Sequence, residues 1–179
     1  MRFVRNLLPR QDGRHVDRSE SGSDQAAVLS RVAADTAAGR FGEALALIDG
    51  SLGNARDDFE LRFARASTLF SWWRYAEAYA ALIALEQSGA RGAAFYTKLG
   101  WTCYWLNRVD EAARWMREAV ARDDDDWATH FGRAITLRAL KRPAASRQAF
   151  ERVLELKQDD PHENLLGPGN RRFHRLPWL

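Results

Sequence analysis

The sequence is poor in cysteine and in lysine. It has 179 residues with one cysteine, Cys103, and its 27 basic residues include only three lysines, Lys98, Lys141 and Lys157. A single cysteine excludes an internal disulfide framework and is compatible with a reducing cytoplasm. The formal net charge is only +3. The excess of arginine is therefore more typical of a GC-rich genome than of a nucleic-acid-binding surface.

Long hydrophobic runs are absent. The apolar stretch near the N-terminus is interrupted by Arg5, Asn6 and Pro9, so it lacks the core of a signal peptide. No run approaches the roughly 20 apolar residues that span a bilayer. Hydrophobic residues still make up 46% of the chain, which is enough to build a folded core. We therefore expect a cytoplasmic protein without a membrane span.

Catalytic signatures are also missing. The sequence has no phosphate-binding glycine loop, nucleophile elbow or paired-histidine zinc helix. His130 stands where a bulky core side chain is expected, so we interpret it as a packing histidine. His162 and His174 have no cysteines nearby, and Cys103 lies on a predicted buried stripe where a thiol is inert. We expect neither an enzyme nor a bound cofactor or metal.

A repeat of 34 residues organises the chain. The segments 39–44, 73–78, 107–112 and 141–146 follow one another at this interval, and each has arginine at its second position. Those arginines are Arg40, Arg74, Arg108 and Arg142. The period predicts four units without insertions, which are residues 25–58, 59–92, 93–126 and 127–160.

Each unit has the pattern of a helical hairpin. In the third unit, Tyr96, Leu99, Gly100 and Cys103 fall at helical spacing and form one apolar stripe. A turn follows at residues 107–108, and a second stripe is formed by Ala112, Met116 and Ala119. Small residues are needed where two helices cross closely, so Gly100 and Ala112 are predicted to lie at such a crossing.

Aspartates mark the predicted helix starts. Asp24, Asp58 and Asp126 immediately precede three of the first helices, where a carboxylate can cap free backbone N–H groups. The acidic run 123–126 is therefore interpreted as a connection ending in an N-cap. Clustered carboxylates that bind a metal are the alternative that we disfavour.

These features resemble the tetratricopeptide repeat family over residues 25–160. The resemblance rests on the 34-residue period and on small or apolar residues at matching positions. These are Leu99, Gly100, Ala112 and Ala119 in the third unit, Ala66, Ala78 and Leu85 in the second, and Ala134, Phe150 and Val153 in the fourth. The first unit departs from the family, because Arg31 and Asp35 stand at usually apolar positions. The resemblance implies an all-α fold, a right-handed superhelical α-solenoid of about four hairpins with a short C-terminal helix stub.

The two ends do not fit the repeat. Residues 1–24 are polar, and segment 19–24 has the composition of a linker, so we expect a flexible N-terminal segment. Asp160 and Pro161 begin a fifth helix that the breaker at 167–169 stops early. The tail beyond it is basic and aromatic. We consider two alternatives for this tail. It is either a frayed, unstructured terminus, or it docks on this chain or on a partner through Phe173, Leu176, Trp178 and Leu179.

The resemblance implies that the first helix of each unit lines a concave groove. The groove candidates are Phe63, Ser67, Phe70, Thr97, Lys98, Trp101, Tyr104, Trp105, Phe131, Ile135 and Arg138. Tyr96 is expected to pack between units, while exposure of Trp101 and Trp105 in the groove is weighed against burial between units.

Some members of the family clamp a terminal carboxylate with lysine and asparagine side chains. Here the asparagine positions hold Ala33, Ser67, Trp101 and Ile135, and the lysine positions hold Leu29, Phe63, Thr97 and Phe131. We therefore predict an apolar or aromatic peptide ligand instead, with Lys98 and Arg138 contacting its polar parts.

The leading interpretation is a scaffold for another protein or peptide, either an adaptor or a chaperone-like module. In size and repeat count it is similar to the small chaperones of bacterial type III secretion, which is an analogy of fold alone. One alternative is single-stranded RNA binding through Arg171, Arg172 and Arg175 beside Phe173 and Trp178, which the modest net charge disfavours. Another is self-assembly, including a homodimer, through the incompletely capped C-terminal end.

Overall fold

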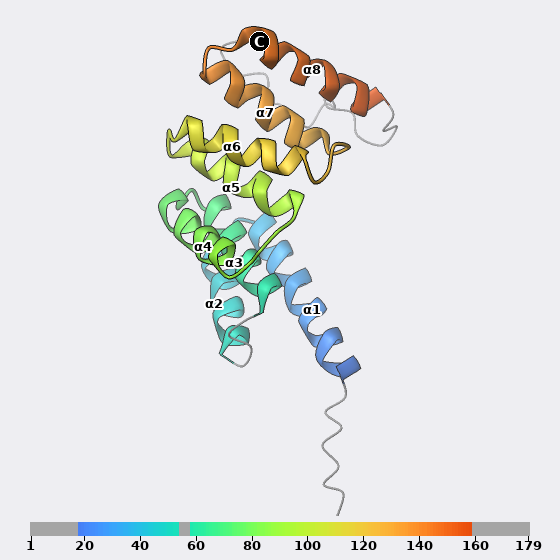
Figure 1. Cartoon of the computed structure of the whole chain (residues 1–179). Coiled ribbons are helices and arrows are strands. Elements are labelled where there is room, and N and C mark those ends of the chain that lie inside the picture. The colour runs from blue at the N-terminus through green and yellow to red at the C-terminus, as the bar shows by residue number, and fades with distance from the viewer. Residues whose placement is uncertain (1–17, 54–57, 159–179) are drawn as a thin grey trace, which may run out of the picture.

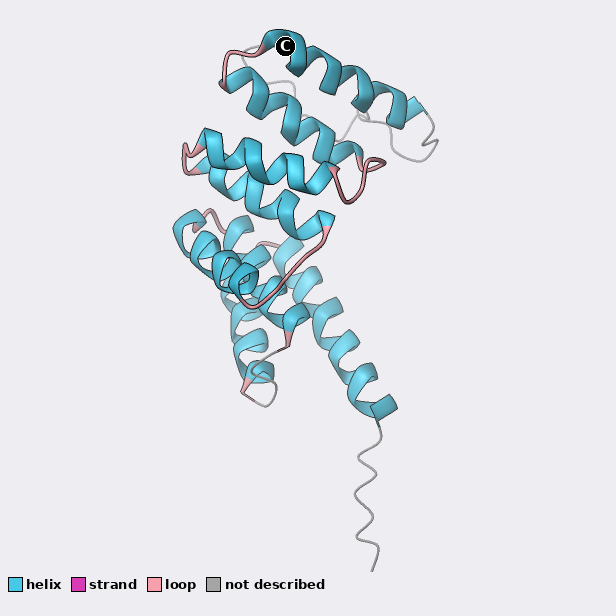
Figure 2. Cartoon of the chain, in the orientation of Figure 1, coloured by secondary structure: helices cyan, strands magenta, loops and turns pink. Residues whose placement is uncertain are grey.

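The computed structural model describes residues 18–53 and 58–158, and within these residues it contains eight α-helices and no strand (Figures 1 and 2). The helices are α1 (Arg18–Ala37), α2 (Phe41–Leu52), α3 (Phe59–Ser71), α4 (Tyr75–Gln87), α5 (Ala93–Trp105), α6 (Val109–Val120), α7 (Trp127–Ala139) and α8 (Pro143–Gln158). The predicted all-helical class is confirmed. The predicted C-terminal stub at residues 161–166 lies outside the described residues.

The helices form four successive hairpins. Helices α3, α5 and α7 begin at Phe59, Ala93 and Trp127, and each start is 34 residues after the previous one. Each hairpin turns through a residue with a left-handed backbone, at Gly39 (φ 77°), Trp73 (φ 61°), Asn107 (φ 60°) and Lys141 (φ 57°). The arginine that follows donates its backbone N–H to a carbonyl near the end of the first helix, as from Arg74 to Leu69 at 3.0 Å. One local geometry therefore sets all four turns.

Two of the three predicted caps are confirmed. The Asp58 carboxylate accepts from the backbone N–H of Leu61, and the Asp126 carboxylate accepts from those of Ala128 and Thr129. Asp24 is not an N-cap residue, because it lies inside α1, and the linker predicted at 19–24 is helical. No proline interrupts that segment, so the helix extends backwards at little cost, since adding a residue is easier than starting a helix.

The solenoid curves because its two layers of helices pack differently. Successive first helices touch one another, α1 with α3, α3 with α5 and α5 with α7, whereas α2, α4, α6 and α8 do not touch one another within the described residues. The first helices therefore occupy the inner, concave side and the second helices the outer, convex side. Figure 1 shows the hairpins stacked in chain order.

Near the centre of the stack, helices of two neighbouring hairpins pack closely against one methionine. The fully buried Met116 side chain lies between two glycines of the concave layer, Gly100 on α5 and Gly132 on α7. A Cβ built at Gly100 would come within 2.9 Å of Met116 Cε, and one built at Gly132 within 2.5 Å. The close approach predicted at Gly100 is confirmed, and it extends to a second glycine in the next unit.

The divergent first unit is held together by an ion pair at a core position. Asp35 is only 2% exposed, and its carboxylate accepts hydrogen bonds from the Nε atoms of Arg40 and Arg31, both at 3.0 Å. The Arg40 hydrogen bond holds the pKa of Asp35 below its ordinary value. The neighbouring units have Leu69, Cys103 and Leu137 at this position. An arginine of the turn thus neutralises the charge that replaces an apolar side chain.

Candidate functional site

A continuous row of aromatic rings crosses the molecule from α3 to α8. Successive ring centroids lie between 5.4 and 6.1 Å apart. In order of contact the rings are Phe70, Tyr75, Trp105, Tyr104, Trp101, Phe131 and Phe150. Five of them belong to first helices. The predicted groove aromatics of three units are therefore brought together, except for Phe63.

The tryptophans of this aromatic row are not sealed in the interior. Trp105 is 54% exposed and stacks on Tyr75. Trp101 is half-buried, because its indole meets Tyr104 edge-on and lies against Phe131. Tyr96 is 3% exposed, which confirms its predicted packing role. The row thus covers much of its own surface and leaves Trp105 as its most open ring.

Other predicted groove residues have structural partners. Phe63 packs against Phe59 and Phe95 at the interface between two units. The Thr97 hydroxyl donates to the Ala93 carbonyl and shares a hydrogen bond with the Thr129 hydroxyl. Phe63 and Thr97 therefore stabilise contacts between neighbouring helices.

Four groove candidates remain, and one of them, Ser67, lines the hollow described below. The ammonium of Lys98 lies 4.8 Å from the centre of the Phe70 ring, and its burial lowers the pKa of Lys98. Arg138 is exposed near the end of α7. Ile135 is only 8% exposed, so it presents little surface to a ligand at the position that Ser67 and Trp101 hold in the preceding units. Lys98 and Arg138 are the two basic side chains among the predicted groove residues.

An open hollow lies on the concave side between α1 and α3. Its volume is about 370 Å³. It is lined by Leu29, Val32, Ala33, Thr36, Ala37, Ala64, Ser67, Thr68 and Ser71. One unit later the positions of Thr36, Ala64, Ser67 and Ser71 hold Phe70, Lys98, Trp101 and Trp105. The large side chains that fill the interval between α3 and α5 are therefore absent between α1 and α3.

Sequence reasoning missed two exposed tryptophans in the turn between α3 and α4. Trp72 is 37% exposed and stacks on Phe41, and Trp73 is 71% exposed. Trp73 occupies the left-handed turn position that Gly39 and Asn107 hold in the neighbouring hairpins. An alignment of the repeats would have revealed it, because glycine and asparagine suit that conformation and tryptophan does not.

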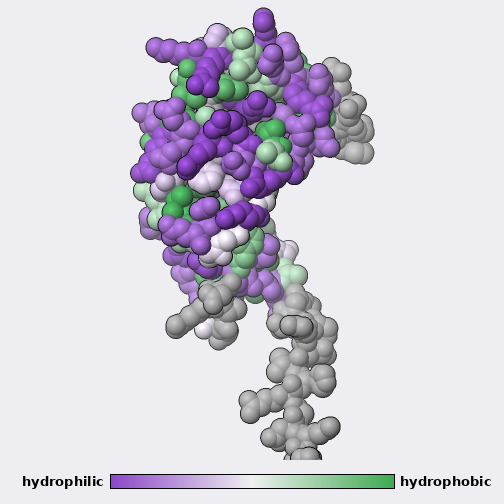
Figure 3. All heavy atoms as spheres, viewed as in Figure 1, coloured by the Kyte–Doolittle hydropathy of each residue, from purple (hydrophilic) through white to green (hydrophobic). Residues whose placement is uncertain are grey.

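On the face in Figure 3, hydrophobic residues form small separate patches among hydrophilic ones.

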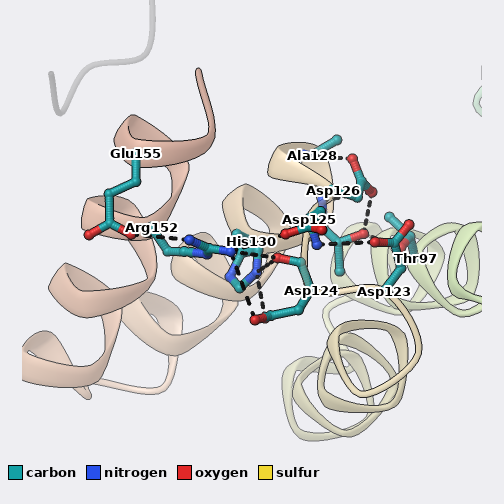
Figure 4. A network of polar contacts seen from close by, with 10 residues as sticks. Thr97, Asp123, Asp124, Asp125, Asp126, Ala128, His130, Arg152 and Glu155 are labelled. Atoms are coloured by element: carbon teal, nitrogen blue, oxygen red, sulfur yellow. Dashed lines mark hydrogen bonds and ion pairs between the residues drawn. The ribbon is translucent and has the colours of Figure 1, made fainter. Parts of the chain in front are cut away.

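The acidic run before α7 builds a polar network. His130 is 3% exposed, and its Nε2 lies 3.0 Å from the Asp124 carbonyl oxygen and 3.1 Å from its carboxylate (Figure 4). Both partners are acceptors, so Nε2 carries a proton. Arg152 of α8 reaches the Asp125 carboxylate at 3.1 Å. Among the described residues, no three histidine, cysteine or acidic side chains are placed to hold a metal ion, and the network joins the loop to α7 and α8.

Some predictions cannot be placed. The tail residues Phe173, Leu176, Trp178 and Leu179, and the basic residues Arg171, Arg172 and Arg175, lie outside the described residues. No helix in the described part of the chain combines the length and the apolar character needed to cross a membrane.

Comparisons with known proteins identify the fold. No protein-family model matches the chain, and no curated protein matches it by sequence. Among solved structures it is similar to "MamA 41-end from Desulfovibrio magneticus RS-1", with TM-score 0.66, 18% identity and coverage of 75% of this chain and 76% of that one. It is also similar to a MamA structure from AMB-1, with TM-score 0.63, 21% identity and coverage of 73% and 78%. The chain therefore has the all-helical, tetratricopeptide-like solenoid fold of these MamA structures.

Proposed function

We propose that the protein is a non-catalytic scaffold that binds an apolar segment of a partner protein on its concave side. The observation that carries this proposal is the open hollow between α1 and α3, which adjoins the aromatic row. On α3, Ser67 and Ser71 line the hollow, and Phe70 between them begins the row. A partner segment can therefore place one side chain in the hollow and lie along the rings.

The chemistry of the hollow suits an apolar side chain. Its volume of about 370 Å³ is within the range of about 300–1,000 Å³ that is common for ligand pockets. Leu29, Val32, Ala33 and Ala64 contribute apolar walls, and none of its lining residues is charged. The hydroxyl of Thr36, at its edge, is 3.1 Å from the hydroxyl of Thr68, so these two groups satisfy each other.

The aromatic row supplies anchors beside the hollow. Tryptophan and tyrosine carry a large share of binding energy in many protein interfaces, because their rings bury much area with little loss of conformational freedom. More than half of the Trp105 surface is exposed to solvent, and the stacked ring of Tyr75 restricts the orientation of the indole. Lys98 is already held over the Phe70 ring. This arrangement favours an apolar or aromatic peptide over a terminal carboxylate.

The proposal is tested by filling the hollow. Peptides are selected from a displayed random library on the full-length protein, and their affinities are measured by isothermal titration calorimetry. Ser67→Trp introduces the residue that the next unit has at this position, Trp101. We expect it to weaken the selected peptides by about tenfold or more, since it removes the site of one buried side chain. Ala80→Trp adds the same ring at an exposed position on α4 and serves as the matched control.

Two results would contradict the proposal. Equal affinity of the Ser67→Trp variant and the wild type would exclude the hollow as the site. If the selected peptides contain no apolar residues, the proposal that the hollow binds an apolar side chain is wrong. A labelled single-stranded RNA is titrated in parallel, and RNA binding that falls steeply with salt while no peptide binds would favour the nucleic-acid alternative.

A further inference from the structure

A second cavity lies on the convex side, where α6 meets the last hairpin. Its volume is about 340 Å³. It is lined by Asp110, Ala113, Arg117, Arg133, Leu137, Leu140, Arg142 and Ala145. Arg133, Leu137 and Leu140 occupy the side of α7 opposite to Phe131 and Arg138, because an α-helix completes a turn in about 3.6 residues. The cavity is therefore separate from the concave surface.

Three arginines at this cavity have no acidic partner in the described part of the chain. Most other arginines there form ion pairs, for example Arg40, Arg65, Arg74 and Arg108. The side chains of Arg117, Arg133 and Arg142 form no ion pair and no hydrogen bond with any other described residue. The one carboxylate that lines the cavity, Asp110, pairs with none of them. Three guanidinium groups thus surround an apolar floor.

The preceding interface shows which side chains normally fill this space. Between α4 and the hairpin α5–α6, the Tyr79 hydroxyl donates to the Glu111 carboxylate at 2.9 Å. Arg108 lies over the Tyr79 ring at 4.4 Å and pairs with Glu111. In the cavity, alanine replaces both Tyr79 and Glu111, at Ala113 and Ala145, while Arg142 replaces Arg108. The arginine is kept, but the ring and the carboxylate are gone.

The first interface of the stack also has carboxylates that pair with its arginines, and the cavity lacks them. Between α2 and the hairpin α3–α4, Arg65 pairs with Asp49 at 2.9 Å, and Arg74 pairs with Glu77 at 2.6 Å. At the cavity the positions of Arg65 and Arg74 hold Arg133 and Arg142. Their partners Asp49 and Glu77 are replaced by Arg117 and Ala145. Both anionic partners are therefore lost, and one of them is replaced by a further cation.

We propose that this cavity binds an acidic peptide segment of a partner protein that carries an aromatic or apolar side chain next to its carboxylates. Such a segment supplies what Tyr79 and Glu111 supply in the preceding interface. The ring fills the space above Ala113, and the carboxylates pair with Arg142, Arg133 and Arg117. Guanidinium groups bind carboxylates through paired hydrogen bonds, so clustered arginines suit acidic motifs. The site uses none of the residues of the concave surface and does not depend on the function proposed there.

The test uses the full-length protein and a labelled peptide of alternating glutamate and tyrosine, measured by fluorescence anisotropy. Its control peptides replace glutamate with glutamine or tyrosine with glycine, and both are expected to bind more weakly. Arg133→Leu introduces the residue of the preceding unit, Leu99, and should weaken the acidic peptide by about tenfold, since a hydrogen bond to a charged group is lost. Arg147→Leu removes an exposed charge from α8 and should leave the affinity unchanged.

A refilling variant keeps the test decisive even if Arg133→Leu folds poorly. The double substitution Ala113→Tyr with Ala145→Glu rebuilds the arrangement of Tyr79 and Glu111, so it should preserve the helical circular dichroism spectrum and abolish binding. Binding that survives refilling would overturn the proposal, as would binding of a labelled RNA in place of the peptide. A rise in affinity on deleting residues 159–179 would also overturn it, because the cavity would then belong to this chain's own segment. Trp105→Ala should not affect this peptide, which separates the two sites.

Discussion

The indole of Trp105 stacks on the phenol ring of Tyr75 with their centroids 5.8 Å apart and their planes 8° apart. Tyr75 is the first residue of α4, and Trp105 is the last residue of α5. The contact therefore joins the end of one hairpin's first helix to the beginning of the second helix of the preceding hairpin. Phe41 and Trp72 make a similar stacked pair one unit earlier, at 5.8 Å.

We predict that Trp105→Ala destabilises the protein modestly. A stacked aromatic pair contributes about 0.5–1.5 kcal/mol beyond its area, so we expect a loss of about 1–2 kcal/mol in urea unfolding. Burial raises the pKa of Tyr75, and removing the indole should move that pKa back toward its ordinary value in an ultraviolet titration. Trp73→Ala is the matched control, because Trp73 is 71% exposed and no ring of the described residues stacks on it. Equal destabilisation by both substitutions would show that the stack contributes nothing.

Trp73→Gly should stabilise the protein. Trp73 has φ 61°, and a left-handed backbone costs an ordinary residue roughly 1–2 kcal/mol that glycine does not pay. Glycine holds the same turn position at Gly39. We expect a gain of about 1 kcal/mol in the free energy of unfolding, measured in urea. A decrease in stability would show that the exposed indole makes a stabilising contact.

Met116 makes the effects of two glycine substitutions depend on each other. In the single variants Gly100→Ala and Gly132→Ala, the terminal atoms of Met116 can move toward the remaining glycine. In the double variant both spaces are closed, so we expect it to cost about 1–3 kcal/mol more than the sum of the two, as in other overpacked cores. Gly42→Ala, where a Cβ meets nothing within 4 Å, should instead be stabilising because alanine favours helices. Additive effects in calorimetry would exclude this shared space.

Local features of the fold could be predicted from the sequence, whereas choices between packing partners could not. The period located the hairpins, and the caps at Asp58 and Asp126 follow from chemistry within one turn of chain. The pattern also placed Tyr96 in the core. Helical spacing alone does not reveal that Ile135 is buried, because its neighbours come from other helices.

The candidate sites were predicted only in part, for the same reason. The aromatic side chains of the row were identified, but their packing against one another depends on three hairpins. The position of the hollow depends on Ser67 and Ser71 being smaller than Trp101 and Trp105. Comparing equivalent positions between units would have revealed the hollow, and also the arginine-lined cavity beside Ala113 and Ala145. The information was in the sequence, but it lay in the differences between repeats.

Cys103 should be unreactive in the folded protein. Burial, with a further contribution from the Glu111 carboxylate, raises the pKa of this thiol to about 12. Since the thiolate is the reactive form, a disulfide reagent at neutral pH should modify Cys103 only at the rate of unfolding. Full modification is expected in denaturing urea, and the Cys103→Ser variant gives the background. Rapid stoichiometric modification without denaturant would contradict the burial of this side chain.

The ion pair at Asp35 should make stability depend on pH. The Arg40 hydrogen bond lowers the pKa of Asp35 in the folded state. A group whose folded pKa is depressed stabilises the protein above its unfolded pKa, about 3.9 for aspartate, and loses that contribution as pH falls toward the folded value. We therefore expect the wild type to be more stable than Asp35→Asn at neutral pH, and the difference to shrink below about pH 4. Urea unfolding across this range measures it.

A second variant distinguishes the charge from the space that it occupies. Asp35→Leu introduces the residue found at the equivalent positions Leu69 and Leu137, and the arginines can turn to water because Arg40 is 46% and Arg31 66% exposed. Replacing a buried ion pair by an apolar side chain is often neutral or stabilising. We therefore expect Asp35→Leu to be at least as stable as Asp35→Asn. Its stability should also lack the acid-dependent loss that Asp35 gives the wild type.

A difference between wild type and Asp35→Asn that stays constant down to acid pH would show that the pair contributes no charge-dependent stability, since protonating Asp35 would then change nothing.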